Sequence, residues 1–300
     1  MRDDQDPAGL AGVEELGRYT DGELSDDDAG LLSSIEPLSH KSLAALNNLA
    51  RYKPPVDPYP FPEGRAAVLV CLFGSRSGDN LNVLLSTRSE TLRTYPGQVA
   101  LPGGKMDDTD MNLEATARRE AFEEVGLPID TTRIRYLTSL PPFLARSMVL
   151  VTPVVCFVLD YSLKPEINPS EVSGLFSFPL EAFLTSSPTH PVFHHPHPPA
   201  VQRGEAPYHL HEDYPWFDGR QHRYHSFEAS PQAVTGLTAE ILIQVAMIAY
   251  GRAPDFPFAA PDQRPYDELI ARAMRDPKWE ENRRGQHRRK AEKKEHGSKL

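Results

Sequence analysis

Three glutamates, Glu120, Glu123 and Glu124, are the residues whose types and spacing most clearly indicate chemistry in this sequence. Separations of three and four residues place side chains on one face of a helix, so the three carboxylates are expected to lie together. Clustered carboxylate oxygens are hard ligands that suit Mg²⁺ or Mn²⁺, and these ions in turn bind diphosphates. The competing interpretation is a solvated acidic helix face.

The flanking residues predict a helix over 113–125 that would position these carboxylates. Asn112 or Asp110 can cap its start, and Gly126 can end it in the left-handed conformation. Gly103 and Gly104 come before the helix, and glycine lets the backbone approach a ligand closely. Apolar residues at helical spacing would seat the helix on a core: Leu113, Ala117, Ala121 and Val125.

Residues 103–127, GGKMDDTDMNLEATARREAFEEVGL, resemble the Nudix box. Its pattern is Gly, five or six residues, Glu, seven residues, then Arg-Glu-apolar-x-Glu-Glu-x-Gly-apolar, and the match from Arg119 to Leu127 is complete. The front half departs from the pattern, because Met111 stands at the expected Glu position and Asp110 lies one residue earlier. The departure puts one accessory carboxylate in doubt and leaves the three main ones intact.

The resemblance implies roles for residues of the site. Glu120 is either a further metal ligand or the general base, and Arg119 should orient a box carboxylate, for example Glu123 one turn on. If the general base lies outside the box, Glu171 is the candidate, because it opens a predicted strand near the expected rim. The implied metal ligands are the carboxylates of Glu123 and Glu124 and the backbone carbonyl of Gly103.

Residues 84–104, LLSTRSETLRTYPGQVALPGG, resemble the signature of the coenzyme A-directed branch of Nudix hydrolases, here in a peroxisomal, fungal-like form. Ser86 replaces Thr and Leu101 replaces Phe in that signature. Coenzyme A carries an additional ribose 3′-phosphate, and guanidinium groups bind phosphates bidentately. Arg88 and Arg93, with the Gly104 backbone, are therefore the expected substrate-binding groups; the alternative is that one arginine merely pairs with a box carboxylate.

The resemblance implies a metal-dependent diphosphatase that cuts coenzyme A or its thioesters into 3′,5′-ADP and 4′-phosphopantetheine. One alternative is a Nudix diphosphatase that removes oxidised nucleotides such as 8-oxo-dGTP. A reduced-NAD diphosphatase is disfavoured, because its four-cysteine zinc module and Ser-Gln-Pro-Trp-Pro-Phe-Pro motif are absent from the sequence. A third alternative is a Nudix-fold binding protein without catalysis, which the intact glutamates disfavour.

The tripeptide Ser298-Lys299-Leu300 matches a peroxisomal address read by an import receptor, and it predicts a peroxisomal location. The formal net charge of −10 argues against general nucleic-acid binding. No apolar run reaches membrane-spanning length, and residues 1–30 contain no apolar signal region. Cys71 and Cys156 lie inside apolar runs, which indicates core residues rather than a disulfide or zinc site.

The expected architecture is the α/β/α sandwich of the Nudix fold with a mixed central sheet, an assignment that rests on the resemblance. We expect a disordered acidic N-terminus at 1–33, and a helix followed by a Pro-rich linker at 34–63. The hydrolase domain would span 64–255, and a surface helix with a basic tail would follow at 256–300. Strands are predicted at 65–73, 81–87, 97–101, 133–140, 149–160 and 171–178, and a last helix from Gly236.

Residues 184–227 hold eight of the eleven histidines and many prolines. A histidine-rich tract can bind a transition metal. The favoured interpretation is a surface insertion flanking a hairpin, built from YHLHEDYPWF and RYHSFEA. The eight histidines are His190, His194, His195, His197, His209, His211, His222 and His225.

Overall fold

The computed structural model describes residues 38–59, 64–193, 199–276 and 279. Their elements follow in the order α3 (His40–Arg51), β1 (Arg65–Gly74), β2 (Leu81–Arg88), β3 (Val99–Ala100), β4 (Gly103–Lys105), α4 (Leu113–Val125), β5 (Ile134–Ser139), β6 (Phe143–Leu144), β7 (Leu150–Val158), β8 (Val172–Pro179), η1 (Leu180–Leu184), α5 (Pro199–Gln202), β9 (His209–Pro215), β10 (Gln221–Phe227), β11 (Val234–Thr235), α6 (Gly236–Tyr250) and α7 (Tyr266–Ala273).

The main sheet has eight strands in the order β3-β2-β1-β7-β5, with β4 beside β1, β6 beside β7 and β8 beside β2. β1 and β7 are parallel, whereas the other pairs are antiparallel, so the sheet is mixed as predicted. Both central strands are mostly apolar and almost entirely buried, because helices cover both faces of the sheet. Cys71 and Cys156 lie side by side in them as buried free thiols, which confirms the prediction of core cysteines.

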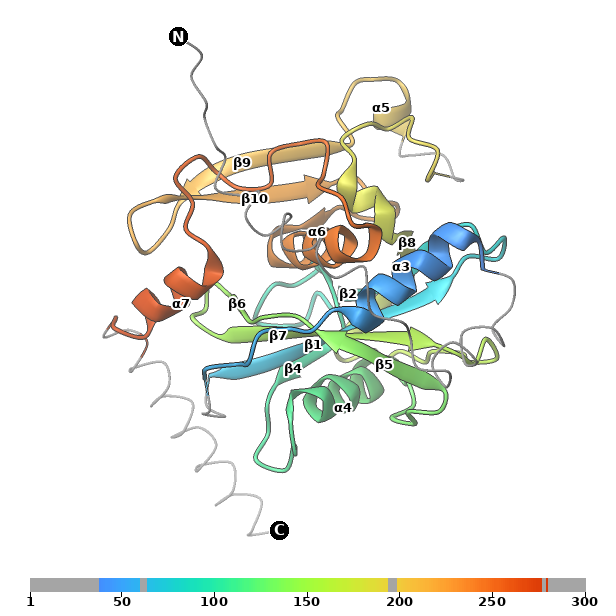
Figure 1. The fold of residues 1–300 in the computed structure, drawn as a ribbon, viewed down its shortest axis with the longest axis horizontal. Coiled ribbons are helices and arrows are strands. Elements are labelled where there is room, and N and C mark those ends of the chain that lie inside the picture. Colours follow the sequence, from blue (N-terminus) through green and yellow to red (C-terminus); the bar gives the residue numbers. More distant parts are fainter. Residues whose placement is uncertain (1–37, 60–63, 194–198, 277–278, 280–300) are drawn as a thin grey trace.

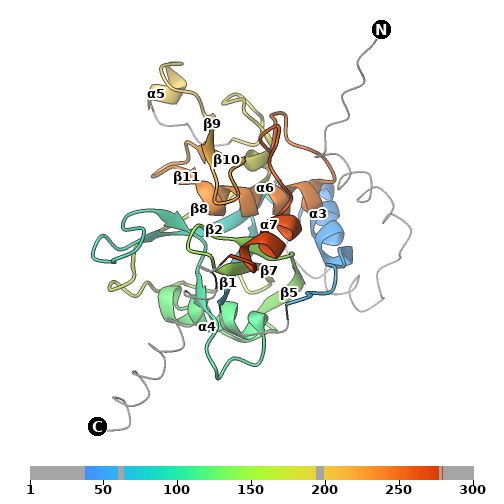
Figure 2. The same ribbon diagram turned by 90° about the vertical axis from the view of Figure 1, so that its left-hand side faces the viewer.

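Helices form layers on both sides of the sheet, with α4 on one face and α3 and α6 on the other (Figure 1, Figure 2). The Nudix α/β/α sandwich is therefore confirmed. α6 is apolar almost all round, and nearly all of its residues are buried because a second sheet packs on its outer side. None of the helices in the described part of the chain is long and apolar enough to cross a membrane.

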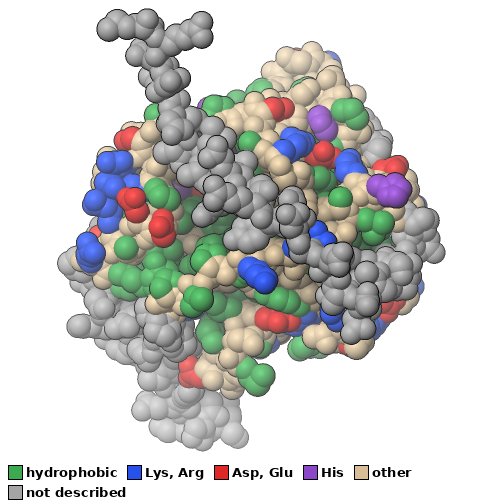
Figure 3. All heavy atoms as spheres, viewed as in Figure 1, with side chains coloured by type: hydrophobic (Ala, Val, Ile, Leu, Met, Phe, Trp, Pro, Cys, Tyr) green, Lys and Arg blue, Asp and Glu red, His purple; other side chains and the backbone are tan. Residues whose placement is uncertain are grey.

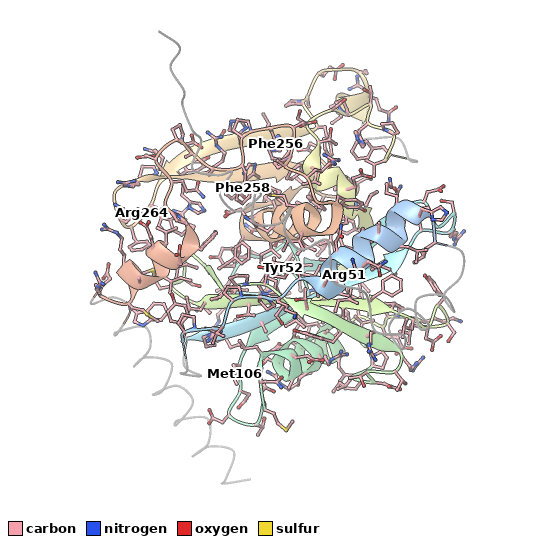
Figure 4. All side chains as sticks on the ribbon, viewed as in Figure 1. Arg51, Tyr52, Met106, Phe256, Phe258 and Arg264 are labelled. Atoms are coloured by element: carbon pink, nitrogen blue, oxygen red, sulfur yellow. The ribbon has the colours of Figure 1, made fainter. Side chains whose placement is uncertain are left out.

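The second sheet, ordered β11-β10-β9, contains the hairpin predicted in the histidine-rich segment. β10 is largely buried, because α6 covers one of its faces and the segment containing Phe256 and Phe258 covers the other (Figure 4). The hairpin is therefore part of the main core. A surface insertion would not need to pack into the core in this way. The end of the hydrolase domain is expected at residue 255, but Phe256 also packs in this core.

Helix α4 begins and ends as the sequence predicts. The Asn112 side chain caps it by accepting from the Ala115 backbone N–H at 2.8 Å, and Gly126 ends it at φ 67°. Asp110, the other expected cap, has a different role, described below. Buried Ala117, Ala121 and Val125 seat the helix on the sheet.

Several predicted boundaries differ from the observed elements. The strand predicted at 97–101 is confined to β3, because Gly97 instead donates to the Arg88 carbonyl in the β2–β3 turn. The surface helix is α7, whose Leu269, Ile270 and Ala273 are buried beside β6. The expected acidic N-terminus at 1–33 and the Ser298-Lys299-Leu300 tripeptide lie outside the described residues.

Candidate active site

The three glutamates of α4 share one face but differ in exposure. Glu124 is 8% exposed, Glu120 is half-buried, and the Glu123 side chain is 51% exposed. The face points toward β4, with which α4 packs. Helical spacing thus brings the predicted carboxylates to one edge of the main sheet, with Glu124 innermost.

Two glycines of β4 let the sheet backbone reach these carboxylates. The Gly103 N–H donates to Glu124 Oε2 at 3.0 Å. A Cβ at Gly104 would lie 2.5 Å from the Glu120 carboxyl group, and a Cβ at Gly103 would lie 2.4 Å from the Ala67 carbonyl oxygen. Both positions therefore require glycine for close approach, as the sequence suggests.

Arg119 connects the helix to the loop before it. Its Nε and Nη2 donate to the two oxygens of Asp110, each at 2.9 Å, in a bidentate pair. Its Nη1 donates to Glu120 and to Glu123, each at 3.1 Å. The expected Arg119–Glu123 pair is present, and the stronger contact is to Asp110.

Asp110 is the site residue whose role the sequence left in doubt. Its side chain also accepts from the Thr116 hydroxyl at 2.9 Å and from the Asp107 backbone N–H at 2.8 Å. These bonds, the one from Arg119 foremost, lower the pKa of Asp110 to about 2. Met111 is 90% exposed, so the acidic partner of Arg119 comes from one position earlier than the family pattern places it.

The electrostatics of the inner carboxylates differ from those of Asp110. The pKa of Glu124 is raised to about 7, chiefly by burial and in smaller part by the charges of Glu120 and Glu171, while the Gly103 N–H and Arg88 oppose the shift. Burial also raises the pKa of Glu120, against the influence of Arg119. Burial is the main cause of both shifts, and carboxyl groups with raised pKa values are typical of functional sites.

The predicted substrate-binding arginines occupy the turn between β2 and β3. Arg88 is half-buried at the end of β2, and its Nε donates to the Thr94 carbonyl at 3.3 Å. Arg93 is exposed. Neither forms an ion pair with a carboxylate among the described residues, so both guanidinium groups retain donors for a phosphate.

Glu171 directly precedes β8, and its backbone carbonyl accepts from the Ser89 N–H at 2.9 Å. Its charge raises the pKa of both Glu120 and Glu124, which places it at the same site. The candidate base from outside the box therefore lies near the box carboxylates.

The donor chemistry of the site fits a divalent cation. A buried carboxylate with a raised pKa, surrounded by further carboxylates, is the environment that a hard cation would neutralise. Within the described ranges, no group of three or more His, Cys, Asp or Glu side chains converges as a ready-made metal cage. Arg119 forms ion pairs with Glu120 and Glu123. These two side chains must therefore rotate before they can bind a metal ion. The exposed side chain of Glu123 has room to do so.

The histidine-rich segment forms no such site in its described part. His222 Nε2 lies 3.1 Å from the Glu240 carboxylate, and His209 Nε2 lies 3.0 Å from His225 Nδ1. Burial, followed by the neighbouring His225, lowers the pKa of His209 to about 3. These three histidines are core residues, whereas His194, His195 and His197 lie outside the described residues.

Comparison with known proteins agrees with this geometry. A family model described as NUDIX domain matches residues 63–200. "Nudix hydrolase 15, mitochondrial" of Arabidopsis thaliana is 38% identical over 205 residues, which are 67% of this chain and 64% of that protein. "Peroxisomal coenzyme A diphosphatase 1, peroxisomal" of Saccharomyces cerevisiae is 36% identical over 181 residues, 50% of this chain and 52% of that protein.

"Peroxisomal coenzyme A diphosphatase NUDT7" of Mus musculus is 32% identical over 185 residues, which are 60% of this chain and 68% of that protein. The matched regions of the two preceding relatives cover less than two thirds of their length. The match thus extends well beyond the box itself.

Proposed function

The chain belongs to the Nudix hydrolase family, and we propose that it hydrolyses the diphosphate bond of coenzyme A or its thioesters. The products would be 3′,5′-ADP and 4′-phosphopantetheine or its acylated form. The observation that carries the proposal is the cluster formed by buried Glu124 and half-buried Glu120 and Glu171, with Arg88 acting on it from the end of β2. Similarity to proteins named coenzyme A diphosphatases supports this substrate.

The carboxylates have a clear task in such a reaction. Glu123 and Glu124, with the Gly103 carbonyl, would hold Mg²⁺ or Mn²⁺, which neutralises phosphate charge and acidifies water when bound. Arg119, itself fixed by Asp110, positions Glu120 and Glu123. The geometry of the site therefore depends on the loop before α4 as well as on the helix.

The remaining polar groups divide into a proton acceptor and phosphate binders. Glu120 and Glu171 are the two candidates to take the proton of an attacking water, and the variants Glu120→Gln and Glu171→Gln would distinguish them. The base is the residue whose loss lowers kcat while Mn²⁺ affinity persists. Arg88 and Arg93 are suited to the diphosphate and the 3′-phosphate, because each offers a planar fork of N–H donors.

The proposal is tested by product analysis on purified protein with Mg²⁺, offering coenzyme A, acetyl-coenzyme A, reduced NAD and 8-oxo-dGTP. We expect 3′,5′-ADP from the first two substrates and its loss in Glu124→Gln. Cleavage of 8-oxo-dGTP alone would contradict the coenzyme A assignment and the roles of Arg88 and Arg93. Absence of turnover with Mg²⁺ and with Mn²⁺ would contradict catalysis itself.

For the cellular location, we propose the peroxisome, on the names of the yeast and mouse relatives. Another relative is named mitochondrial, so the location needs its own test. A fluorescent protein fused to the N-terminus should co-localise with a peroxisomal marker, and deletion of residues 298–300 should make it diffuse. Mitochondrial fluorescence would contradict the proposal.

A further inference from the structure

β9 is an exposed edge strand of the second sheet. Among the described strands it pairs with β10 alone, and all of its residues after His209 are exposed, from Leu210 to Pro215. Figure 1 shows it along the outer side of β10. Natural proteins protect such edges with lysines, bulges, short strands or a covering segment. β9 pairs in regular register over seven residues, contains no lysine and has a proline only at its last position, so within the described ranges it is open to a further strand.

The hydrogen bonds of the hairpin show which backbone groups of β9 point outward. The Glu228 N–H donates to the Tyr208 carbonyl at one end of the hairpin, and the Trp216 N–H donates across it at the other end, each at 2.8 Å. In an antiparallel pair, residues that exchange hydrogen bonds alternate with residues that do not, so the even-numbered residues of β9 bond β10. The N–H and C=O groups of the odd-numbered residues His211 and Asp213 therefore point to the free edge.

The side chains of β9 form a self-complementary pattern about Glu212. Leu210 and Tyr214 lie two positions to either side of it on the same face of the strand, and they are 51% and 41% exposed. His211 and Asp213 lie one position to either side, on the opposite face. In an antiparallel pair of two β9 strands centred on Glu212, leucine therefore faces tyrosine and imidazole faces carboxylate, each at two symmetric places. Apolar pairs and pairs of an N–H donor with a carboxylate both stabilise neighbouring strands.

The neighbouring registers lack this match. Because side chains alternate between the two faces, a symmetric pair of strands can slip only in steps of two residues. A slip in one direction places Glu212 opposite Leu210, and a slip in the other direction places Asp213 opposite its own copy. The register centred on Glu212 also brings the outward N–H and C=O groups of His211 opposite those of Asp213 in the other strand, where they can exchange hydrogen bonds.

We propose that β9 is a dimerisation edge, to which a second copy of this chain adds its own β9 in antiparallel orientation. Such an interface is isologous, because each strand supplies both members of every pair. A strand edge buries less area than an obligate interface, so the dimer exchanges reversibly with the monomer and depends on protein concentration. The two Glu212 side chains face each other at the centre and oppose association, because their charges are alike. The proposal does not depend on the proposed function.

Two charge variants that complement each other test the proposal by sedimentation velocity over a range of concentrations. His211→Asp sets carboxylate against carboxylate at both symmetric places, and Asp213→His sets imidazole against imidazole. Each variant alone should have a dimer dissociation constant at least about tenfold above that of wild type. In an equimolar mixture of the two, every carboxylate again faces an imidazole, so association should recover. His40→Asp is the matched control, because it makes the same change at an exposed histidine of α3 and should leave the dimer unchanged.

Asp213 also forms an ion pair with Arg223, so the melting temperature of Asp213→His is measured first. Should this variant fail to fold, His211→Pro and Glu212→Gln replace it. The first removes an N–H that points away from β10 and should abolish the dimer, whereas the second removes like charge and should tighten the dimer about two- to fivefold. Wild type that stays monomeric, as expected if another segment or another protein covers β9, would overturn the proposal. A mixture that does not recover association, or an unchanged dimer in His211→Pro, would overturn it as well.

Discussion

Two buried glutamates on different helices, Glu240 and Glu124, differ in what surrounds their carboxyl groups. Glu240 of α6 is 4% exposed, and Glu124 of α4 is 8% exposed. Glu240 lies 3.1 Å from His222 Nε2 and accepts from the Tyr266 hydroxyl at 2.5 Å. Glu124 accepts one described hydrogen bond, from the Gly103 N–H, and faces other carboxylates.

This difference is the basis on which we propose that Glu240 is a structural carboxylate and Glu124 a metal-binding one. A buried polar group that finds its partners inside the protein contributes to the fold. A buried carboxylate whose pKa is raised by burial and like charge costs stability, and such groups cluster at functional sites. Burial and residue type alone would have made the two glutamates look alike.

The surface shows no comparable concentration of charge on the face drawn in Figure 3. Positive and negative side chains are interspersed there, which is typical of a solvated surface.

The largest expected effect concerns the free energy of unfolding, which should change in opposite directions when Glu124 and Glu240 are each replaced by glutamine. In Glu124 the folded pKa, about 7, lies above the ordinary value of 4.5, so stability falls as the pH rises between these values. Glu124→Gln should therefore stabilise the metal-free protein at pH 8 by up to about 3 kcal/mol. Glu240→Gln should destabilise it by about 1–3 kcal/mol, because a partner is left unsatisfied.

Urea unfolding of both variants in EDTA at pH 5 and pH 8 measures these changes. The gain in Glu124→Gln should shrink at pH 5, where the wild-type carboxyl group is already protonated. Equal destabilisation by both substitutions would contradict the distinction between the two glutamates.

Gly104→Ala should lower kcat/KM by about a hundredfold, because small misplacements of catalytic groups have effects of that size. The added Cβ would lie 2.5 Å from the Glu120 carboxyl group and would displace it. Since the Gly104 backbone is not in the left-handed region, the melting temperature should change little. Wild-type turnover in this variant would show that Glu120 does not need its observed position.

Asp110→Asn should remove a pH-dependent contribution to stability. The folded pKa of Asp110, about 2, lies below the ordinary value of 3.8, so its contribution is present above pH 4 and is lost as the pH falls toward 2. The side chain is 4% exposed, and the contribution is about 2 kcal/mol. Acid unfolding of the variant should lose this slope.

Asp160→Asn is the matched control for Asp110→Asn. Its pKa is also lowered to about 2, by Ser162 first and then by Arg133, but its side chain is 30% exposed, against 4% for Asp110, so solvent screens its interactions more. Its effect on acid unfolding should be smaller. A larger effect at Asp160 would contradict the importance assigned to the Arg119–Asp110 pair.

The smallest expected effect is that of Met111→Glu, which restores the family pattern. Met111 is 90% exposed and Asp110 already holds Arg119, so kcat/KM should stay within about twofold of wild type. A gain well above this would show that the position one residue later still has a role in the site.

Local sequence rules sufficed for α4, because its caps, apolar stripe and carboxylate spacing are all set within a few residues. They did not suffice for Asp110, whose bond to Arg119 crosses nine residues and depends on the path of the loop at 105–112. The same holds for the contact that buried Arg118 makes with Cys156 on β7. Long-range packing decided these roles, as it did for His222 and His225 in β10.

The central claim, that Glu124 is a metal ligand and Glu240 a structural residue, is tested most directly by Mn²⁺ titration calorimetry at pH 7.5. Wild type and Glu240→Gln should bind Mn²⁺ with the same affinity, whereas Glu124→Gln should bind it at least about tenfold more weakly. Equal affinity of Glu124→Gln and wild type would contradict the claim.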